Sequence, residues 1–221
     1  MKLYSGPLSL FARKVEIALA EKGLAFEREM VPFTQAAGYS PKHKAVLAAN
    51  PKGQVPVLVD GDLALFDSTL IFEYLEDVAP EPRLWPAGVV QRARARQIEH
   101  ASDEVFFPHV ARLMGLEHDM GSEAAIAACN ACARFYDALE GSLVDNEYLA
   151  GTYSFADIAF YMAQVFAERK GARMTQATPR LQVWRERVGA RQAVREVVRP
   201  MMAFLASNGR PVPAYLKSLL G

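Results

Sequence analysis

The sequence predicts a small α/β domain followed by an all-helical domain. Strand and helix patterns alternate over residues 1–79, whereas residues 91–221 show helical periodicity and no strand signal. The segment between them, residues 80–90, contains three prolines and a glycine, which is typical of a linker. The chain has 221 residues, of which 51% are hydrophobic, and this is enough to bury a sizeable core.

The first domain is predicted from alternating local patterns. Two apolar runs joined at Asp60-Gly61 predict a hairpin, because this pair accepts the positive φ of a tight turn. Gly23 follows a helical pattern and ends it, as a C-terminal glycine does. The expected elements are a strand at 2–5, a helix that starts near Phe11, a weaker strand at 26–31, a hairpin at 55–67 and a helix at 68–78.

Long helical patterns fill the second domain. Pro108 is expected to bend the first of them, because proline removes a backbone donor and clashes with the preceding turn. Ser154 and Asp157 have the spacing of a capping box, which starts the third. The expected helices span residues 91–115, 123–143, 155–170 and 179–205, followed by an irregular tail and a candidate last turn.

Composition and charge disfavour several classes of protein. The chain has 25 basic and 25 acidic residues, so there is no basic field to hold a nucleic acid backbone. We expect no membrane-spanning helix and no signal peptide, because long apolar runs are missing from the sequence. Two cysteines do not make a disulfide framework. The expectation is a cytoplasmic protein without nucleic acid or membrane partners.

Ser9 lies at the joint between the first strand and the first helix. Serine is a preferred N-cap, because its oxygen accepts a backbone N–H of the first turn. The same position suits chemistry on a thiol, since a helix N-terminus favours a bound anion and a hydroxyl there can donate to a thiolate. A free thiol has a pKa of about 8.5, and each unit of lowering needs about 1.4 kcal/mol of preferential thiolate binding. Spacing alone leaves both interpretations open.

Two further segments have both a structural and a functional interpretation. Val55-Pro56 opens a strand, either as a proline at a strand start or as a cis peptide that turns the Val55 backbone toward a peptide-like ligand. Asp67 and Ser68 precede a helix, which either residue can cap. They can also bind the α-amino acid end of a ligand, with Ser68 and the helix N-terminus on its carboxylate and Asp67 on its ammonium.

Together, these segments resemble the N-terminal half of glutathione S-transferases. The resemblance is dense in KLYSGPLSLFARKVEIALAEKGLAFE (2–27) and NPKGQVPVLVDGDLALFDSTLIFEYLED (50–77). In the second half, GTYSFADIAF (151–160) is similar to another motif of this superfamily. The resemblance implies a thioredoxin-like domain with a glutathione site, and a helical domain that provides a pocket for an electrophile.

The resemblance also implies roles for individual residues at the glutathione site. Ser9 is the hydroxyl that supports the glutathione thiolate, and Val55, ahead of cis-Pro56, pairs through its backbone with the cysteinyl part. Asp67 and Ser68 hold the γ-glutamyl end. Lys42 and Gln54 contact the glycyl end, because they stand where members of the serine-type classes make this contact. His43 is a substitute candidate for Lys42.

For the electrophile pocket, the resemblance implies a wall made by one helix of the second domain. That helix carries Phe106, Phe107, His109, Arg112, Leu113 and Met114. Helical core is the alternative interpretation for its apolar members. The candidate contacts with the electrophile are Phe11, Phe106, His109, Arg112 and Leu113.

The sequence departs from the family pattern at some positions, and some of its residues have no expected role at the site. Asp67 stands where the family often has glutamate, one methylene longer, and no cysteine lies near Ser9, which argues against disulfide exchange as the main activity. Tyr4, a rival for the catalytic hydroxyl, falls inside the first strand. Cys129 and Cys132 lie in a predicted helix without a second pair at zinc spacing, so no metal is expected.

The predicted function is a glutathione transferase, with glutathione as co-substrate, that conjugates the thiolate to a small hydrophobic electrophile, as in detoxification. The resemblance also implies a homodimer. One alternative is a glutathione-dependent isomerase or dehalogenase on the same site. A ligand carrier and a non-enzymatic regulator of the stringent starvation type are the others. The presence of Ser9, Val55-Pro56 and Asp67-Ser68 together favours an enzyme.

Overall fold

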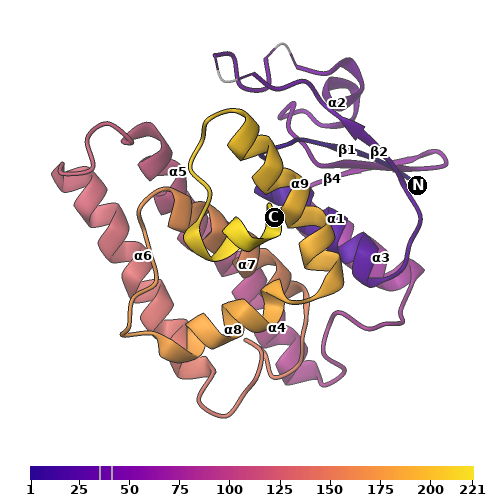
Figure 1. The fold of residues 1–221 in the computed structure, drawn as a ribbon. Coiled ribbons are helices and arrows are strands. Elements are labelled where there is room, and N and C mark those ends of the chain that lie inside the picture. Colours follow the sequence, from indigo (N-terminus) through magenta and orange to yellow (C-terminus); the bar gives the residue numbers. More distant parts are fainter. Residues whose placement is uncertain (35, 41) are drawn as a thin grey trace.

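The fold is described from a computed structural model, which describes residues 1–34, 36–40 and 42–221 (Figure 1). The first part of the chain contains a mixed sheet in the order β2-β1-β3-β4. β1 pairs in parallel with β2 and antiparallel with β3, and β3 pairs antiparallel with β4. Its elements are β1 (Lys2–Ser5), α1 (Leu10–Glu21), β2 (Glu27–Met30), α2 (Lys44–Ala49), β3 (Val57–Asp60), β4 (Leu63–Phe66) and α3 (Ser68–Val78).

The β3–β4 hairpin lies where the sequence predicts it, but its turn is one residue later than predicted. Asp60 pairs with Leu63, so the loop consists of Gly61 and Asp62. Gly61 has φ 58°, whereas Asp62 has no positive φ. A tight turn with glycine at its first central position needs positive φ only there, which explains why the loop starts at Gly61 rather than at Asp60.

The second part of the chain is helical, as predicted. No helix in the described part of the chain is both long and apolar enough to cross a membrane. Cys129 and Cys132 lie on α6 as free thiols. The helices are α4 (Val89–Ala101), η1 (Ser102–Phe106), α5 (Phe107–Gly115), α6 (Glu123–Ser142), α7 (Phe155–Arg169), α8 (Pro179–Gly189), α9 (Gln192–Ser207) and the 3₁₀ turn η2 (Ala214–Leu219).

Two of the predicted long helices differ in detail from the prediction. The segment 91–115 is helical throughout, but residues 102–106 form the π-helix η1, which connects α4 to α5 and ends just before Pro108. Pro108 lies in the first turn after this π-helix and has no backbone N–H to donate, so the helical hydrogen-bond ladder is irregular at the predicted place. The segment 179–205 is divided between α8 and α9, with a break at residues 190–191.

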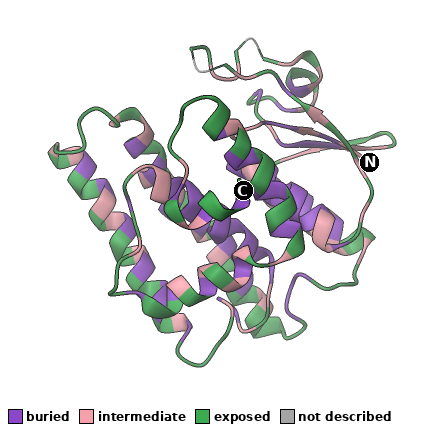
Figure 2. Ribbon diagram, viewed as in Figure 1, coloured by how far each residue is buried: buried purple, intermediate pink, exposed green. Residues whose placement is uncertain are grey.

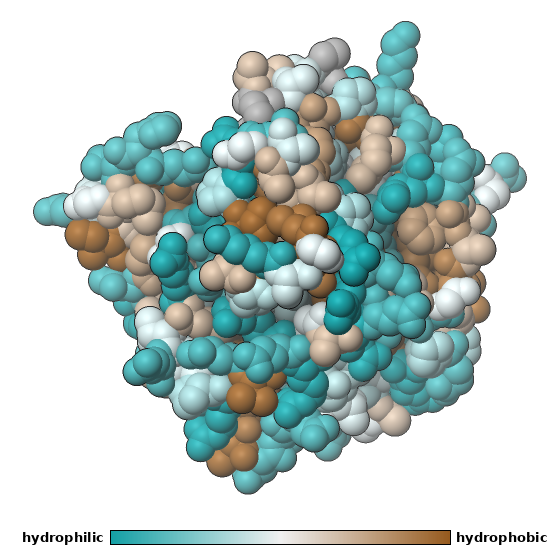
Figure 3. Space-filling view, in the orientation of Figure 1, coloured by the Kyte–Doolittle hydropathy of each residue, from teal (hydrophilic) through white to brown (hydrophobic). Residues whose placement is uncertain are grey.

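Helix α7 forms the centre of the helical domain. Every residue from Phe155 to Ala167 is buried, which is visible as a purple helix in Figure 2. The predicted capping box is present at its start, and Asp157 also accepts hydrogen bonds from the Leu149 N–H at 3.0 Å and the Trp184 Nε1–H at 2.8 Å. Most of the surface on this face carries hydrophilic side chains, with smaller hydrophobic areas between them (Figure 3).

Helix α1 joins the two domains. It packs against α3 on one side and against α7 and α9 of the helical domain. Its buried Lys14 forms ion pairs with Glu99, at 2.9 Å, and with Asp103. At the C-terminus of α1, the Glu21 carboxylate accepts two hydrogen bonds from the Arg191 guanidinium, at 2.6 and 2.8 Å. These contacts hold α1 against the helical domain, and Ser9 lies at the N-terminus of this helix.

Candidate functional site

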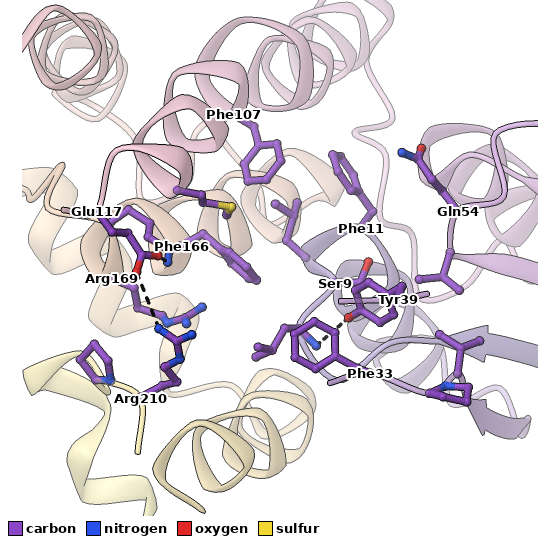
Figure 4. A pocket seen from close by; sticks show the side chains of 18 of the residues that line it. Ser9, Phe11, Phe33, Tyr39, Gln54, Phe107, Glu117, Phe166, Arg169 and Arg210 are labelled. Carbon is purple, nitrogen blue, oxygen red and sulfur yellow. Dashed lines mark hydrogen bonds and ion pairs between the residues drawn. The ribbon is translucent and has the colours of Figure 1, made fainter. Parts of the chain in front are cut away.

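A cavity of about 700 Å³ lies between the two domains. One wall belongs to the sheet domain and comes from the N-terminus of α1, from residues 31–33, 39 and 42–43, and from residues 53–55. The opposite wall comes from α5, from the end of α7 and from residues 210–211. Figure 4 shows side chains from both domains that face this space. Among the predicted site residues, those that line it are Ser9, Phe11, Lys42, His43, Gln54 and Val55.

Ser9 caps α1 and also faces the cavity. Its Oγ accepts the Ala12 N–H at 3.2 Å, while its backbone has the extended conformation of an N-cap. Within the described residues, Ser9 Oγ accepts this hydrogen bond and donates none. The hydroxyl proton is therefore available to a ligand. The first N–H groups of α1 have no intrahelical acceptor, because the helix ladder starts only with Arg13 N–H to the Ser9 carbonyl. The two interpretations of Ser9 are therefore compatible.

Tyr39 lies beside Ser9 in the same wall, and the sequence pattern does not indicate it. Its hydroxyl accepts the Leu8 N–H at 3.0 Å, and its ring lies 4.8 Å from the ring of Phe33. Burial raises the pKa of Tyr39 to about 12, so the phenol stays protonated at neutral pH. Gly6 is required here, because a Cβ at this position would come within 2.5 Å of the Tyr39 hydroxyl.

A cis peptide bond lies directly before strand β3. The Val55–Pro56 bond is cis, as one of the two interpretations of the sequence predicts, while the pairing of the Val55 backbone with a ligand stays a prediction. Val55 lines the cavity, whereas Pro56 is buried behind it. The backbone carbonyl of Gln54 accepts a hydrogen bond from Asn50 Nδ2 at 2.7 Å, which holds the main chain in place. The Gln54 side chain is exposed.

Lys42 and His43 lie side by side at the edge of the same wall. His43 Nε2 lies 3.0 Å from Glu29 Oε1, and its ring packs 5.3 Å from the ring of Tyr4. His43 Nδ1 is buried and has no hydrogen-bond partner in the described part of the chain. Lys42 is exposed, and its aliphatic stem packs near Gly53. Both side chains can therefore offer a polar atom to a ligand next to Gln54.

Asp67 and Ser68 lie next to this wall but outside the cavity lining. Val57 pairs with Phe66 in the hairpin, and Pro56 and Asp67 are the chain neighbours of this last pair. Asp67 caps α3 through the Thr69 N–H at 3.0 Å, with φ 73°. A non-glycine residue in this region of φ costs about 1–3 kcal/mol and such residues gather at functional sites. Ser68 is buried at the first turn of α3.

Of the five candidate contacts with the electrophile, one lines the cavity and four do not. Phe11 lines the cavity, with its ring 5.3 Å from the ring of Phe107 on the opposite wall. Phe106 and Leu113 are fully buried in the helical core and do not line it. His109 and Arg112 are also outside the lining, and Arg112 is exposed. The π-helix η1 precedes α5 and changes the face that each of its residues presents, so Phe107 and Met114 reach the cavity instead.

No group of three or more histidine, cysteine or acidic side chains suited to a metal ion occurs within residues 1–34, 36–40 and 42–221. The chemistry that the cavity wall can offer comes from hydroxyls, backbone groups and cations. A hydroxyl at a helix N-terminus, next to a strand edge, can bind and stabilise an anionic nucleophile such as a thiolate.

Comparisons with known proteins assign the two domains. Residues 3–83 match the family model "Glutathione S-transferase, N-terminal domain", and residues 100–192 match "Glutathione S-transferase, C-terminal domain". A glutathione S-transferase from Rhodospirillum rubrum F11 has the same fold, with a TM-score of 0.81 and 28% identity. That match covers 99% of this chain and 98% of the other.

Two curated relatives differ in the kind of protein that they represent. Glutathione S-transferase 3 from Zea mays is 34% identical over 217 residues, which covers 90% of this chain and 93% of the relative. The stringent starvation protein A homolog from Coxiella burnetii is 36% identical over 107 residues. The chain spans about half the length of that second relative, since the match covers 48% of each. The two domain matches and the full-length relative agree, and the chain belongs to the glutathione S-transferase family.

Proposed function

We propose that this chain is a glutathione transferase, which joins the sulfur of glutathione to an electrophilic carbon. The observation that supports this most is the position of Ser9. Its hydroxyl lies in the wall of an interdomain cavity, at the N-terminus of α1, with its proton available to a ligand. Membership of the glutathione S-transferase family supports the same conclusion.

In this proposal, glutathione lies along the sheet-domain wall. The Val55 backbone pairs with the cysteinyl part, and this places the thiol toward Ser9. The γ-glutamyl ammonium binds Asp67, while its carboxylate binds Ser68 and the N-terminus of α3. The glycyl carboxylate lies near Gln54, where Lys42 or His43 supplies a cation. The strained backbone of Asp67 supports a binding role for that residue.

The chemical step is nucleophilic attack by the bound thiolate. Ser9 donates a hydrogen bond to the sulfur and, with the dipole of α1, lowers the thiol pKa. The sulfur electron pair then forms a bond to the electrophilic carbon. The electrons of the broken bond leave with the departing group, or form an enolate that takes a proton from water when the electrophile is an unsaturated carbonyl compound.

The electrophile occupies the part of the cavity between the two walls. Three aromatic side chains, Phe11, Phe107 and Phe166, lie there, and Phe107 contacts both of the others, with ring centroids at 5.3 and 6.3 Å. In Figure 4 Phe11 lies on the Ser9 side of the cavity, and Phe107 and Phe166 lie on the side of the helical domain. Flat apolar surfaces of this kind suit a small hydrophobic electrophile. A detoxification role in the cytoplasm is consistent with such a substrate.

The proposal is tested by incubating the purified protein with glutathione and chlorodinitrobenzene, and by measuring the thioether and the released chloride. We expect both products in equal amounts, at a rate well above the uncatalysed reaction. If glutathione binds but no conjugate forms with this or other aryl halides and enals, the transferase proposal is wrong.

A second candidate is a non-enzymatic regulator, and the match to the stringent starvation protein A homolog from Coxiella burnetii favours it. Such a protein keeps the fold for contacts with other proteins. It has no need of a glutathione site, so absence of glutathione binding in the same experiment would support this candidate.

We also propose a homodimer. Leu70, Val89, Val90 and Val105 are more than half exposed, and they lie on α3, at the start of α4 and on η1. Helices α3 and α4 are neighbours, since Arg96 forms a two-pronged ion pair with Glu73 at 2.6 and 2.9 Å. Light scattering at micromolar concentration should give twice the mass of the chain, and Val90→Glu should shift it to the monomer. A monomeric mass for the native protein would contradict this.

A further inference from the structure

The two ends of the cavity differ in charge. Figure 4 shows Ser9, Tyr39 and Phe11 toward one end, and Glu117, Arg169 and Arg210 toward the other, with Phe107 and Phe166 between them. The second end also contains Lys170 and Arg173. These five charged residues come from the end of α7 and from the loops that follow α5, α7 and α9, and we refer to them as the cationic end.

The cationic end carries a surplus of positive charge that the rest of the chain does not share. Four of its residues are basic and one is acidic, whereas the whole chain has 25 of each kind. Concentrating like charges in a partly enclosed space focuses the electrostatic potential there and attracts anions. The surplus therefore belongs to the cavity and not to a generally basic surface.

Glu117 does not neutralise this surplus. It forms ion pairs with Lys170 and with Arg210, the second at 3.7 Å. No ion pair with an acidic residue is recorded for Arg169 or Arg173 within the described residues, and Arg169 Nε is buried without a hydrogen-bond partner there. The Arg169 guanidinium instead packs over the Phe166 ring, at 5.2 Å from its centre.

Holding Arg169 in this place is unfavourable without an anion. Burial, and then the nearby charge of Arg210, lower the pKa of Arg169 to about 10. A buried donor without a partner adds a further penalty. An anion bound at the Arg169 guanidinium would satisfy the donor and offset its repulsion from Arg210, and planar carboxylates match the guanidinium fork particularly well.

We propose that the cationic end is an anion subsite, and that the electrophile of this enzyme carries a carboxylate remote from its reacting carbon. The reacting carbon lies near Ser9, an apolar body lies against Phe11, Phe107 and Phe166, and the carboxylate binds Arg169 and Arg173. This inference rests on the proposed transferase function and replaces a purely hydrophobic electrophile with an amphipathic anionic one. The carboxylates of glutathione are separate from it, because their proposed partners lie at the other wall.

Binding is tested with two fluorescent dyes, in the presence of saturating glutathione so that its own carboxylates occupy their site. Anilinonaphthalenesulfonate and phenylnaphthylamine have the same apolar body and differ by one sulfonate. We expect the sulfonate dye to bind about tenfold more tightly or better, with an affinity that falls as salt is added. Equal affinity for both dyes would overturn the proposal.

Variants identify the residues responsible. Arg169→Ala and Arg173→Ala should each weaken the sulfonate dye about tenfold and leave the neutral dye unchanged. Arg169→Lys keeps the charge and should retain most of the preference, which separates an electrostatic role from packing on Phe166. Arg134, an exposed residue of α6 outside the cavity lining, provides the control Arg134→Ala. Equal losses in Arg134→Ala and Arg173→Ala would contradict a local subsite.

Turnover is tested with para-bromomethylbenzoate and its methyl ester, each rate being divided by its uncatalysed rate. We expect kcat/KM to favour the carboxylate about tenfold, and Arg169→Ala to abolish that preference. Equal turnover of acid and ester would refute the anionic substrate while leaving the transferase function intact. If neither compound reacts, the dye titrations still decide whether the subsite exists, and the failure is then that of the transferase function.

Discussion

Phe106 and Phe107 are adjacent in the chain and face opposite environments. Phe106 is fully buried, with its ring 5.2 Å from that of Phe160 in the helical core. Phe107 lines the interdomain cavity, with its ring 5.3 Å from that of Phe11 in the other domain. The π-helix η1 ends at Phe106, so the wider turn determines which of the two aromatic rings reaches the cavity.

This relationship predicts opposite effects of two neighbouring substitutions. Phe106→Ala removes a core side chain and should lower the free energy of unfolding by about 3–5 kcal/mol. Phe107→Ala should cost much less stability and should instead raise KM for a hydrophobic electrophile several-fold, because it removes part of the cavity wall. Urea unfolding and steady-state kinetics of both variants check this. Equal loss of stability in the two variants would contradict the assignment of Phe107 to the cavity.

Ser9→Ala should reduce conjugation about 10-fold to 1000-fold, since one donor to the thiolate is lost. It should also cost about 1 kcal/mol of stability, because Ser9 caps α1. Ser122 caps α6 with the same geometry, accepting the Ala125 N–H at 3.3 Å, and is not part of the cavity lining. Ser122→Ala is therefore the matched control.

The comparison is made at a temperature where both variants are folded, as monitored by circular dichroism. We expect Ser122→Ala to lose similar stability and no activity. If the two variants lose activity in proportion to their stability, Ser9 acts only as a cap.

Asp67→Asn should weaken glutathione binding about tenfold, because the charge that binds the γ-glutamyl ammonium is removed. Asparagine keeps a side-chain acceptor for the Thr69 N–H and tolerates positive φ, so the melting temperature should change little. Asp62, exposed in the hairpin loop, provides the control Asp62→Asn. Calorimetric titration with unchanged affinity in Asp67→Asn would remove Asp67 from the site.

Asp103 should make the interdomain contact dependent on pH. Burial raises the pKa of Asp103 to about 6, although Lys14 opposes the shift. In the unfolded chain its pKa is about 3.9, so between the two values the folded protein binds the extra proton and stability rises as the pH falls. Relative to Asp103→Asn, the native protein should gain about 1 kcal/mol between pH 7 and pH 5.

Urea unfolding of both proteins at several pH values measures this difference. A difference that stays constant from pH 7 to pH 5 would show that Lys14 keeps Asp103 ionised throughout that range.

The elements of the sheet domain could be predicted from the sequence because their signals are local. Gly23 indicates where α1 ends, and the two apolar runs of the hairpin indicate where β3 and β4 pair. The start of α7 was equally accessible, since Ser154 and Asp157 act within one turn. Ser9 and Val55-Pro56 could also be predicted from local signals, because each lies at the end of an element whose bounds the sequence indicates.

The opposite wall of the cavity could not be predicted in this way. A π-helix has no reliable sequence signal, so the face that α5 turns toward the cavity could not be predicted. Phe106 and Leu113, which the resemblance implies as electrophile contacts, lie in the core. Tyr39 and the cationic end depend on contacts between segments far apart in the chain. Glu117 and Arg210, for example, meet only because α5 and the loop after α9 converge at the end of α7.

The most direct test of the proposed mechanism is the pKa of the glutathione thiol bound to the protein, measured from the ultraviolet absorbance of the thiolate as a function of pH. For the native protein, we expect a value at least one unit below the free thiol value of about 8.5. In Ser9→Ala, the bound thiol should return toward the free value. A bound thiol with the same pKa in both proteins would contradict a role for Ser9 in forming the nucleophile.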